Sequence, residues 1–552
     1  MTHRWLKYYD EHVPHNLDYP RIPLYQILDD TAAEKADSNC CCFFGKWMTY
    51  GQLQDATNRF AAAAGKLGIK KGDRVALLLP TSPQFIIAYY GLMKAGAIVL
   101  PLNPLYTARE LSFHFDDSGA ETVITIPMFL DKMTEVAEST PLKRIIYSKL
   151  GDFMPLPLGP IQGLREALLI RKAKSDVAEI INMNELLKTP APNFKPVDID
   201  PDEMAALLYS GGTTGIAKGI MLSHYSLVVN AKQAVTWGNL DSGHERLLAV
   251  LPLFHGFGMS INMNAVIMGG GEVVLLPKFS TKNVVQTIDK YKPTFFLGVP
   301  TMFVAFSNLP GLEKYDFSSL NGIFVGAAPL TQAIKDDFEG KTGGSMIEGY
   351  GLTEAVTGIM ANPYQGMQKL GSIGIPFPDM EAKIVGIEDG KDLPPGETGE
   401  IILKGPTLML GYFNMPDITA ETIKDGWLYT GDIGYMDEDG YFYITDRKKE
   451  LIITGGFNVF PREIDEMIYR HPKVMEGICV GLPHDFKGEK IKVYIVLKEG
   501  ETATEEELIS FFKENLAPYK VPSEVEFRTE LPKSAVGKIL RRALVEGENK
   551  SG

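Results

Sequence analysis

A run of glycine and hydroxyl residues that leads to a lysine lies between two short apolar stretches, 205–208 and 220–222. The run reads Tyr209-Ser210-Gly211-Gly212-Thr213-Thr214-Gly215-Ile216-Ala217-Lys218-Gly219. Glycines let backbone N–H groups approach an anion, hydroxyls add hydrogen-bond donors and the lysine adds positive charge. This composition predicts a phosphate-binding loop. The spacing excludes a Walker A loop, because Ile216 or Ala217 stands where the second glycine would be needed. A glycine-rich hairpin without a ligand is the alternative interpretation.

The elements around this loop alternate between short apolar runs and helical patterns. Strands are expected at 75–79, 97–100, 273–276, 295–299, 322–325 and 345–347, and helices at 83–95, from 108 and at 282–291. This alternation predicts an α/β fold with largely parallel sheets. From about residue 380, short strands separated by turns predict an antiparallel subdomain. A small α+β tail follows, with helices at 462–469 and 504–515 and strands near 477–481 and 492–497.

Composition narrows the class of protein. The chain has 552 residues, of which 45% are hydrophobic, so it can bury a sizeable core and is not a disordered chain. The net charge of −14 argues against a nucleic-acid binder. Four cysteines, Cys40, Cys41, Cys42 and Cys479, form neither a disulfide framework nor a zinc pattern, and are expected to be reduced thiols. The first ten residues lack an apolar core typical of a targeting signal, which favours a cytoplasmic location.

Five further segments follow the glycine-rich run in a fixed order. They are Gly326-Ala327-Ala328-Pro329-Leu330, Glu348-Gly349-Tyr350-Gly351-Leu352-Thr353-Glu354, Tyr429-Thr430-Gly431-Asp432, Asp446-Arg447-Lys448-Lys449-Glu450 with Gly455-Gly456, and Pro532-Lys533-Ser534-Ala535-Val536-Gly537-Lys538. All six resemble the motifs of the acyl-adenylate-forming enzymes, which include acyl-CoA synthetases, luciferases and peptide-synthetase adenylation domains. The resemblance extends from Met48 to about Arg542. One departure is Ala217, where many members carry proline; it removes rigidity but no charge.

The resemblance implies a specific architecture. A large N-terminal domain, residues 1–446, would contain two α/β sheet subdomains and a small distorted β-barrel. A hinge at 447–450 would join it to a small mobile α+β C-terminal domain, residues 451–552. Lys449 matches the hinge position of the family.

The chemistry implied is the activation of a carboxylic acid by ATP, followed by transfer to coenzyme A. Two anions, the carboxylate and the α-phosphate, must be brought together, so their repulsion has to be neutralised. Glu354 is the expected Mg²⁺ ligand, because magnesium prefers oxygen ligands and often binds one or two carboxylates plus phosphates. Lys538 would bridge carboxylate and phosphate oxygens, and Thr353 would donate to a phosphate oxygen.

The remaining roles are also implied by the resemblance. Asp432 would accept both ribose hydroxyls, Tyr350 would offer a face to adenine, and Arg447 would hold phosphate or ribose with its planar fork of donors. The other expected nucleotide-binding residues are Ser210, Gly211, Gly212, Thr213, Thr214, Gly215, Lys218, Gly326, Ala327, Ala328, Glu348 and Gly349. Gly455, Gly456 and Phe457 would line the tunnel for the pantetheine arm.

The segment 251–258 matches the part of the family sequence that lies near the acyl site, so it bears on the identity of the acid. His255 is expected to border the pocket together with Phe254 and Gly351, with a structural histidine as the alternative; no partner histidine supports a zinc role. The stretch 259–268 has no acidic residue to hold an amino group, which favours a plain carboxylic acid. The opening residues 4–9 and the insert 153–174 resemble the medium- and long-chain fatty acyl branch.

Several alternatives stay open at this point. They are an aryl- or short-chain-acid CoA ligase, a luciferase-like oxygenase, a ligase for a carrier protein, and a non-catalytic nucleotide-binding protein. Oligomeric state is left open, with a homodimer as one option. Residues 153–174 combine apolar residues with a basic cluster, so they are either a surface loop and helix packed on the domain, which is favoured, or a segment in peripheral contact with a membrane.

Overall fold

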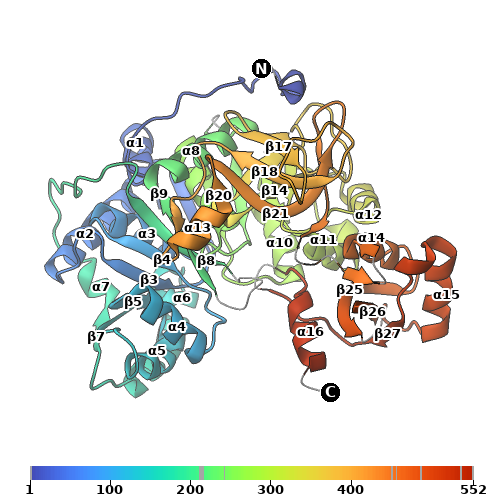
Figure 1. The fold of residues 1–552 in the computed structure, drawn as a ribbon. Helices are drawn as coiled ribbons and strands as arrows, with labels where there is room; N and C mark the ends of the chain where they lie inside the picture. Colours follow the sequence, from blue (N-terminus) through green and yellow to red (C-terminus); the bar gives the residue numbers. More distant parts are fainter. Residues whose placement is uncertain are drawn as a thin grey trace.

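The computed structural model describes residues 3–210, 217–240, 243–448, 450, 452–454, 457–484, 488–534 and 537–549. Figure 1 shows a large body built from the first part of the chain and a smaller lobe, coloured orange to red, formed by its end. Both parts mix helices and strands, so the predicted α/β class with a small α+β tail is confirmed. None of the described helices is long and apolar enough to cross a membrane.

The first large sheet has eight strands, parallel over most of its width. Its order is β19 (Gly411–Tyr412), β9 (Lys218–Ser223), β8 (Met204–Ser210), β4 (Ile98–Pro101), β3 (Arg74–Leu78), β5 (Thr122–Thr125), β6 (Arg144–Tyr147) and β7 (Glu179–Asn182). The inner strands β4 and β5 are buried at every position, as expected for parallel strands covered on both faces. Only β9 and β19 run antiparallel to their neighbours.

The second large sheet has nine strands. Its order is β16 (Ile375–Pro376), β15 (Gly358–Ala361), β14 (Met346–Gly351), β13 (Gly322–Val325), β12 (Phe295–Gly298), β10 (Arg246–Ala249), β11 (Glu272–Leu275), β1 (Asn39–Phe43) and β2 (Lys46–Thr49). The strands from β1 through β11, β10, β12 and β13 to β14 pair in parallel. The carboxyl ends of β12, β13 and β14 therefore meet at one edge, where ligands bind in open α/β sheets.

Helices cover these sheets, and several begin at clear sequence signals. They are α1 (Gln26–Lys35), α2 (Tyr50–Lys66), α3 (Pro83–Lys94), α4 (Ala108–Ser118), α5 (Leu130–Ala137), α6 (Leu158–Lys172), α7 (Met183–Leu186), α8 (His224–Trp237), α9 (Val266–Gly269), α10 (Thr281–Tyr291), α11 (Pro300–Ser307), α12 (Gln332–Thr342) and α13 (Pro416–Thr422). Thr49 and Gln52 form a capping box at the start of α2, and proline opens α3 and α11.

Two smaller sheets complete the chain. An antiparallel sheet contains β17 (Glu381–Val385), β18 (Gly399–Lys404), β20 (Ile423–Lys424), β21 (Trp427–Met436) and β22 (Phe442–Arg447), where the small barrel was expected. The last sheet contains β23 (Ile452–Thr454), β24 (Phe457–Val459), β25 (Val474–His484), β26 (Gly488–Leu497) and β27 (Glu524–Phe527). Its helices are α14 (Pro461–Ile468), α15 (Glu505–Asn515) and α16 (Arg541–Asn549).

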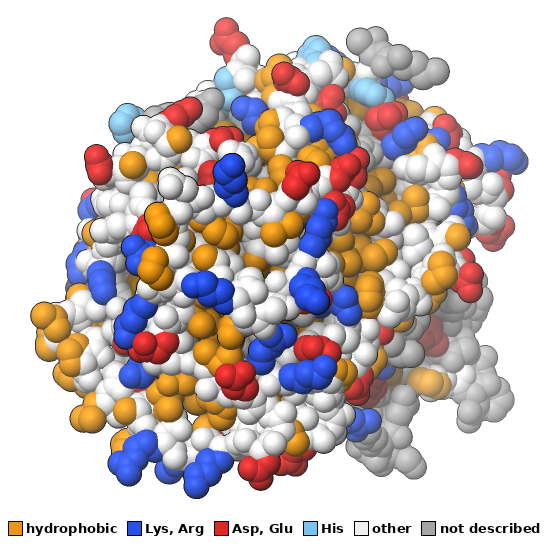
Figure 2. Space-filling model, turned by 90° about the vertical axis from the view of Figure 1, so that its left-hand side faces the viewer, with side chains coloured by type: hydrophobic (Ala, Val, Ile, Leu, Met, Phe, Trp, Pro, Cys, Tyr) orange, Lys and Arg blue, Asp and Glu red, His pale blue; other side chains and the backbone are white. Residues whose placement is uncertain are grey.

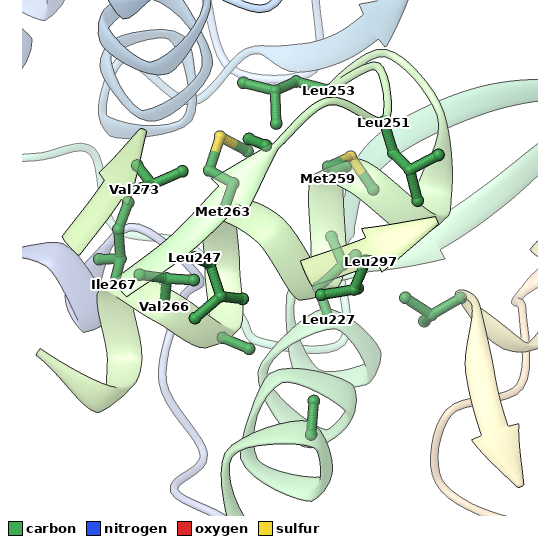
Figure 3. Close-up of a cluster of buried hydrophobic side chains, with 14 of the residues drawn as sticks. Leu227, Leu247, Leu251, Leu253, Met259, Met263, Val266, Ile267, Val273 and Leu297 are labelled. Atoms are coloured by element: carbon green, nitrogen blue, oxygen red, sulfur yellow. The ribbon is translucent and has the colours of Figure 1, made fainter. Parts of the chain in front are cut away.

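The hydrophobic cores separate along the chain. The two clusters of the large body contain buried residues up to Phe442, whereas the two clusters of the lobe begin at Ile452. The domain limits 1–446 and 451–552 stay a prediction. Within the large body, side chains from α8, β10, β12 and the π-helix η4 (Gly258–Ala265) point into one cluster, including Leu227, Leu247, Leu297 and Met263 (Figure 3).

A buried charge joins the first three helices. Lys94, at the end of α3, is completely buried and its ammonium group lies 2.6 Å from Asp29 Oδ1. It also donates to Thr57 Oγ1 at 3.1 Å and Asn58 Oδ1 at 2.7 Å. Burial lowers the pKa of Lys94, and Asp29 opposes this shift. All three donor positions of the ammonium are thus used, which satisfies the charge inside the protein.

We predict that Asp29→Ala destabilises the protein by about 3–5 kcal/mol, because it leaves the buried Lys94 ammonium without its counter-ion. The neighbouring, exposed Asp30 provides the control, and Asp30→Ala should change the free energy of unfolding by no more than about 0.5 kcal/mol. Denaturant unfolding of the three proteins checks this. Equal stability of both variants would contradict the structural role of the pair.

Candidate active site

The glycine-rich run connects the antiparallel strands β8 and β9, with Ser210 paired to Lys218 at the end of the hairpin. Gly211, Gly212, Thr213, Thr214 and Gly215 lie outside the described residues. The described residues Ser210 and Lys218 show where the run leaves β8 and where it enters β9. Lys218 Nζ lies 4.7 Å from the centre of the Tyr412 ring, a cation–π arrangement that holds the lysine beside β19.

Tyr412 also reaches the expected metal ligand. Its hydroxyl donates to Glu354 Oε1 at 3.0 Å, and the Glu354 backbone carbonyl accepts from the N–H of Met409 at 2.8 Å. Lys218 and Glu354 are 136 residues apart but share one aromatic residue as a neighbour. The structure therefore places Glu354 next to the end of the predicted phosphate loop.

The backbone just after Glu354 is strained. Val356 has φ 69° and ψ −66°, and the N–H of Thr357 donates to the carbonyl of Ala355 at 2.9 Å. This is a γ-turn with positive φ, a rare conformation that is especially unfavourable for a β-branched residue. The buried Val356 side chain keeps the turn in place, so the short helix η6 (Thr353–Ala355), which carries Thr353 and Glu354, is held rigidly.

The segment after β13 approaches β14 closely. Ala327 has φ 67°, a left-handed conformation that is uncommon for a residue other than glycine, and Ala328 follows it. A Cβ atom at Gly326 would lie 3.3 Å from the Phe257 ring, and one at Gly351 would lie 1.9 Å from the Thr357 carbonyl oxygen. Glycine at these two positions keeps the edge of the site open.

Glu348 lies beside this edge and is buried. Its Oε1 accepts from the N–H of Leu330 at 3.2 Å, while Oε2 has no hydrogen-bond partner among the described residues. Burial raises the pKa of Glu348 to about 7, against which the positive charge of Arg462 acts. Burial therefore favours the neutral carboxyl group, which can donate as well as accept a hydrogen bond.

Asp432 is the centre of a buried polar cluster. Its Oδ1 lies 2.9 Å from Arg447 Nε, and its Oδ2 accepts from the Tyr350 hydroxyl. Burial and the charge of Asp432 raise the pKa of Tyr350 well above its usual range, so the hydroxyl stays a donor. Each oxygen of Asp432 keeps lone pairs for further donors such as ribose hydroxyls.

The predicted hinge is tied to both parts of the chain. Lys448 lies 2.9 Å from Glu400 Oε2 on β18, whereas Glu450 lies 3.2 Å from Arg541 at the start of α16. Asp446 accepts from the N–H of Arg462 on α14 at 3.0 Å. Residues next to the predicted hinge thus contact both the body and the lobe. Lys449 itself lies outside the described residues.

Lys538 lies on the side of the lobe that faces the body. Loss of hydration and the nearby Arg447 guanidinium lower the pKa of Lys538, while Glu450 and Asp432 act in the opposite direction. The preceding carbonyl of Gly537 accepts from Thr301 Oγ1, at 3.3 Å, on α11 of the body. The contact with Thr301 thus holds the segment that carries Lys538 against the body. Gly455 and Gly456 lie outside the described residues, and of Phe457 only the start of β24 is described.

A cavity lies in the large body, next to the ends of β13 and β14. It measures about 800 Å³, including its opening, and is lined at one end by Gly326, Ala327, Gly349, Tyr350 and Gly351. At the other end its walls are apolar and include Leu247, Phe295 and Trp237. An apolar cavity with a polar end fits an amphipathic ligand, such as an acid with a hydrocarbon chain.

His255 borders this cavity. Its Nδ1 accepts from the N–H of Phe257 at 3.3 Å, which leaves Nε2 as the N–H donor. Burial lowers the pKa of His255 to about 4, so the imidazole is neutral at pH 7. Phe254 is partly buried against the main core and is not among the residues that line the cavity.

Trp237 closes the apolar end. On α8, Asn230 donates to the Gly358 carbonyl at 2.8 Å and Trp237 Nε1 donates to the Asn362 carbonyl at 3.2 Å. Gly358 pairs with Gly351 at the polar end, and seven residues of helix place Trp237 about 10 Å further along. The Trp237 ring packs against Tyr9, at 5.3 Å between centroids, and Phe377, at 4.7 Å.

Sequence reasoning missed several of these residues. Tyr412, Trp237, Glu400 and Thr301 contribute through long-range contacts, and none lies in a segment with a recognisable local pattern. The stretch 4–9 was noted only for its likeness to a branch of the family; its Tyr9 supports the wall of the cavity and donates to the Pro376 carbonyl at 2.7 Å.

Comparison with known proteins agrees with this geometry. Residues 28–413 match the family described as AMP-binding enzyme, and residues 463–538 match the AMP-binding enzyme C-terminal domain. The chain is 41% identical, over 99% of its length and 98% of the relative's, to a long-chain-fatty-acid–CoA ligase of Bacillus subtilis (strain 168).

Two solved structures are similar throughout. ATP-bound MatB from Rhodopseudomonas palustris aligns with a TM-score of 0.84 at 28% identity, over 96% of this chain and 100% of that chain. The anthranilate CoA ligase AuaEII in complex with anthranoyl-AMP aligns with a TM-score of 0.84 at 27% identity, over 97% of this chain and 98% of that chain. The chain therefore belongs to the AMP-binding enzyme family.

Proposed function

We propose that this enzyme joins a medium- or long-chain fatty acid to coenzyme A, using ATP and passing through an acyl-AMP intermediate. The observation that carries the proposal is the cavity that starts at Tyr350 and Gly326 and ends in an apolar pocket closed by Trp237. The similar protein of Bacillus subtilis is named a long-chain-fatty-acid–CoA ligase. The structure of AuaEII holds an acyl-AMP, which supports the same intermediate here.

In the first half-reaction, the carboxylate of the acid attacks the α-phosphate of ATP and pyrophosphate leaves. Asp432 would accept the ribose hydroxyls, and Tyr350 would offer its ring to adenine. Lys538 would neutralise the two anions as they meet; its place in the family motif supports this role, and Arg447 and Asp432 are among the charges that act on its pKa. The neutral His255 would border the carboxylate without adding a charge.

Mg²⁺ would bind Glu354 together with phosphate oxygens, where it would stabilise the charge of the departing pyrophosphate. The described residues contain no cluster of three His, Cys, Asp or Glu side chains that could hold a metal alone. A single carboxylate oriented by Tyr412 fits a cation that obtains most of its ligands from substrate and water. The loop 211–216 would bind the same phosphates through its backbone N–H groups and hydroxyls.

In the second half-reaction, the thiolate of coenzyme A attacks the acyl carbonyl and AMP leaves. Family resemblance assigns this step to a rotated lobe, with Lys449 as the hinge and Gly455, Gly456 and Phe457 beside the pantetheine arm. The partners proposed here are thus a carboxylic acid, ATP and coenzyme A. A cytoplasmic location, peripheral contact with a membrane and a homodimeric state are further proposals.

We predict that AMP and pyrophosphate are released in the presence of ATP, Mg²⁺, coenzyme A and a fatty acid. The value of kcat/KM should rise by about tenfold or more per methylene until the apolar pocket is filled, and removal of Mg²⁺ should abolish release. Acids from acetate to long chains, together with benzoate, form the test panel. A maximum at benzoate or acetate would overturn the fatty-acid substrate, and no release with any acid would overturn the ligase.

Lys538→Ala should reduce acyl-AMP formation by about 10²- to 10³-fold, because a charge that stabilises the transition state is lost. Formation of the thioester from supplied acyl-AMP should be spared. Lys533→Ala is the control: it removes a charge from the same segment, but Lys533 pairs with Glu476 of the lobe, at 2.6 Å. An equal loss of both half-reactions in Lys538→Ala would contradict the role given to Lys538.

Trp237→Ala should shift the preferred acid to longer chains, because it deepens the apolar end of the cavity. The ratio of kcat/KM for a longer acid to that for the wild-type optimum should rise by at least about tenfold. Trp237→Phe, which keeps the packing with Tyr9, should give a smaller shift in the same direction. Trp427→Ala, on β21, is the control. An unchanged chain-length profile in both Trp237 variants would show that the acyl chain does not reach this end.

A further inference from the structure

Helix α6 carries its apolar residues on the side that faces solvent. Leu158, Ile161, Leu164 and Leu168 recur at intervals of three and four residues, so they form one stripe along the helix. All four are exposed; Leu164 is 71% and Leu168 59% accessible. Leu156, just before the helix, is also exposed. An amphipathic surface helix normally buries such a stripe against the core.

The inward side of the same helix carries small and polar residues over its first three turns, and Ile170 packs partly buried against the core near its end. Gly159 and Glu166 are its buried residues. The Glu166 carboxylate accepts from the N–H groups of Leu150, at 2.9 Å, and Gly151, at 3.2 Å. A Cβ atom at Gly159 would lie 2.6 Å from the Gly151 carbonyl oxygen, so the helix is close to the short helix η3 (Leu150–Phe153). Hydrogen bonds and close backbone packing therefore fix the orientation that exposes the leucines.

Single exposed leucines are common, but a continuous stripe of them marks an interaction site. The nearby helix η2 (Pro127–Phe129) packs against α6 and adds the exposed Met128. Figure 2 views the molecule from the side of the eight-stranded sheet; hydrophobic side chains protrude at the lower left edge, and Lys and Arg side chains lie at the lower left of the bottom rim, with Asp and Glu beside them toward the middle.

The charge around the stripe is positive in an acidic protein. Arg165, Arg171, Lys172 and Lys174 lie in or directly after α6, and the one acidic residue between 158 and 174 is the inward-facing Glu166. All four basic residues are exposed, whereas the whole chain has a net charge of −14. Exposed leucines flanked by Lys and Arg suit the interface of a bilayer, where apolar side chains enter the acyl region and cations meet anionic headgroups.

We propose that α6 docks the enzyme onto the surface of an anionic lipid bilayer, with its leucine stripe in the headgroup region and its basic residues on the lipid phosphates. The helix has 15 residues, about 22 Å, which is too short to span the roughly 30 Å hydrocarbon core. It lies parallel to the membrane plane. The leucine stripe and its basic residues thus give the location of the membrane contact proposed above. This proposal does not depend on which acid the enzyme activates.

The test is sedimentation of the full chain with vesicles, in the absence of ATP and acid. Vesicles of phosphatidylcholine with phosphatidylglycerol should bind the wild type, and vesicles of phosphatidylcholine alone should bind it at least tenfold more weakly. Binding should weaken as salt is raised. Because no turnover is measured, failure of the proposed catalytic function would leave this result unchanged, and weak sedimentation would not reflect a lost activity.

Two variants with matched controls separate the contributions. Leu164→Glu/Leu168→Glu should abolish binding, whereas Ile387→Glu, an exposed isoleucine of the antiparallel subdomain, should bind like the wild type. Arg171→Glu/Lys172→Glu should weaken binding by about fivefold or more per residue, whereas Lys391→Glu should not.

Equal sedimentation of the α6 variants and their controls would overturn the proposal. So would a concentration-dependent dimer that Leu164→Glu/Leu168→Glu dissociates while vesicle binding is absent, because a second copy of the chain would then cover the stripe. Far-UV circular dichroism and thermal unfolding of each variant show that the helix and the fold persist. The exposed positions of all substituted residues make large losses of stability unexpected.

Discussion

The buried carboxylate of Asp432 is the charge around which the rest of the site is arranged. A carboxylate away from water is costly unless its oxygens are paired, and here one oxygen meets Arg447 and the other the Tyr350 hydroxyl. Tyr350 belongs to β14 of the nine-stranded sheet, and Arg447 is the last residue of β22. Satisfying this one charge therefore aligns the large sheet with the antiparallel sheet that leads to the hinge.

The ion pairs that follow this cluster along the chain explain the position of the lobe. Lys448 is paired with Glu400 on the body, and Glu450 is paired with Arg541 on the lobe. Arg541 also pairs with Asp465, and burial raises the pKa of Asp465 to about 6. Positive and negative groups alternate along the segment that joins the body to the lobe. A rotation of the lobe would therefore separate or exchange ion pairs, and it would not have to separate a hydrophobic interface. Such polar contacts are exchanged at lower cost than a buried apolar surface, which suits the lobe rotation proposed above.

Local patterns predicted the elements well because each carried its own signal. The strand at 322–325 coincides with β13, and the helix expected at 282–291 begins one residue earlier, at Thr281. The motifs of the family pointed to Asp432, Arg447 and Tyr350, which form one polar cluster in the structure. Tyr412 and Trp237 were not foreseen, because their importance comes from contacts with Glu354 and with the cavity that only folding creates. The γ-turn at Val356 could not be predicted from the sequence either, because no sequence rule places a β-branched residue at positive φ.

The orientation of α6 was left open by the sequence, which favoured a surface loop and helix packed on the domain and kept peripheral membrane contact as the alternative. The leucines have the spacing that a core-facing stripe usually has, yet they are exposed. The outcome is decided instead by Glu166, whose carboxylate caps two backbone N–H groups of η3, and by glycines that allow a close approach. Rotating the helix to bury the leucines would break these hydrogen bonds and bring bulky side chains to the position of Gly159. The exposed stripe is therefore a consequence of specific polar packing beneath it, which holds the leucines at the surface where the proposed bilayer contact would use them.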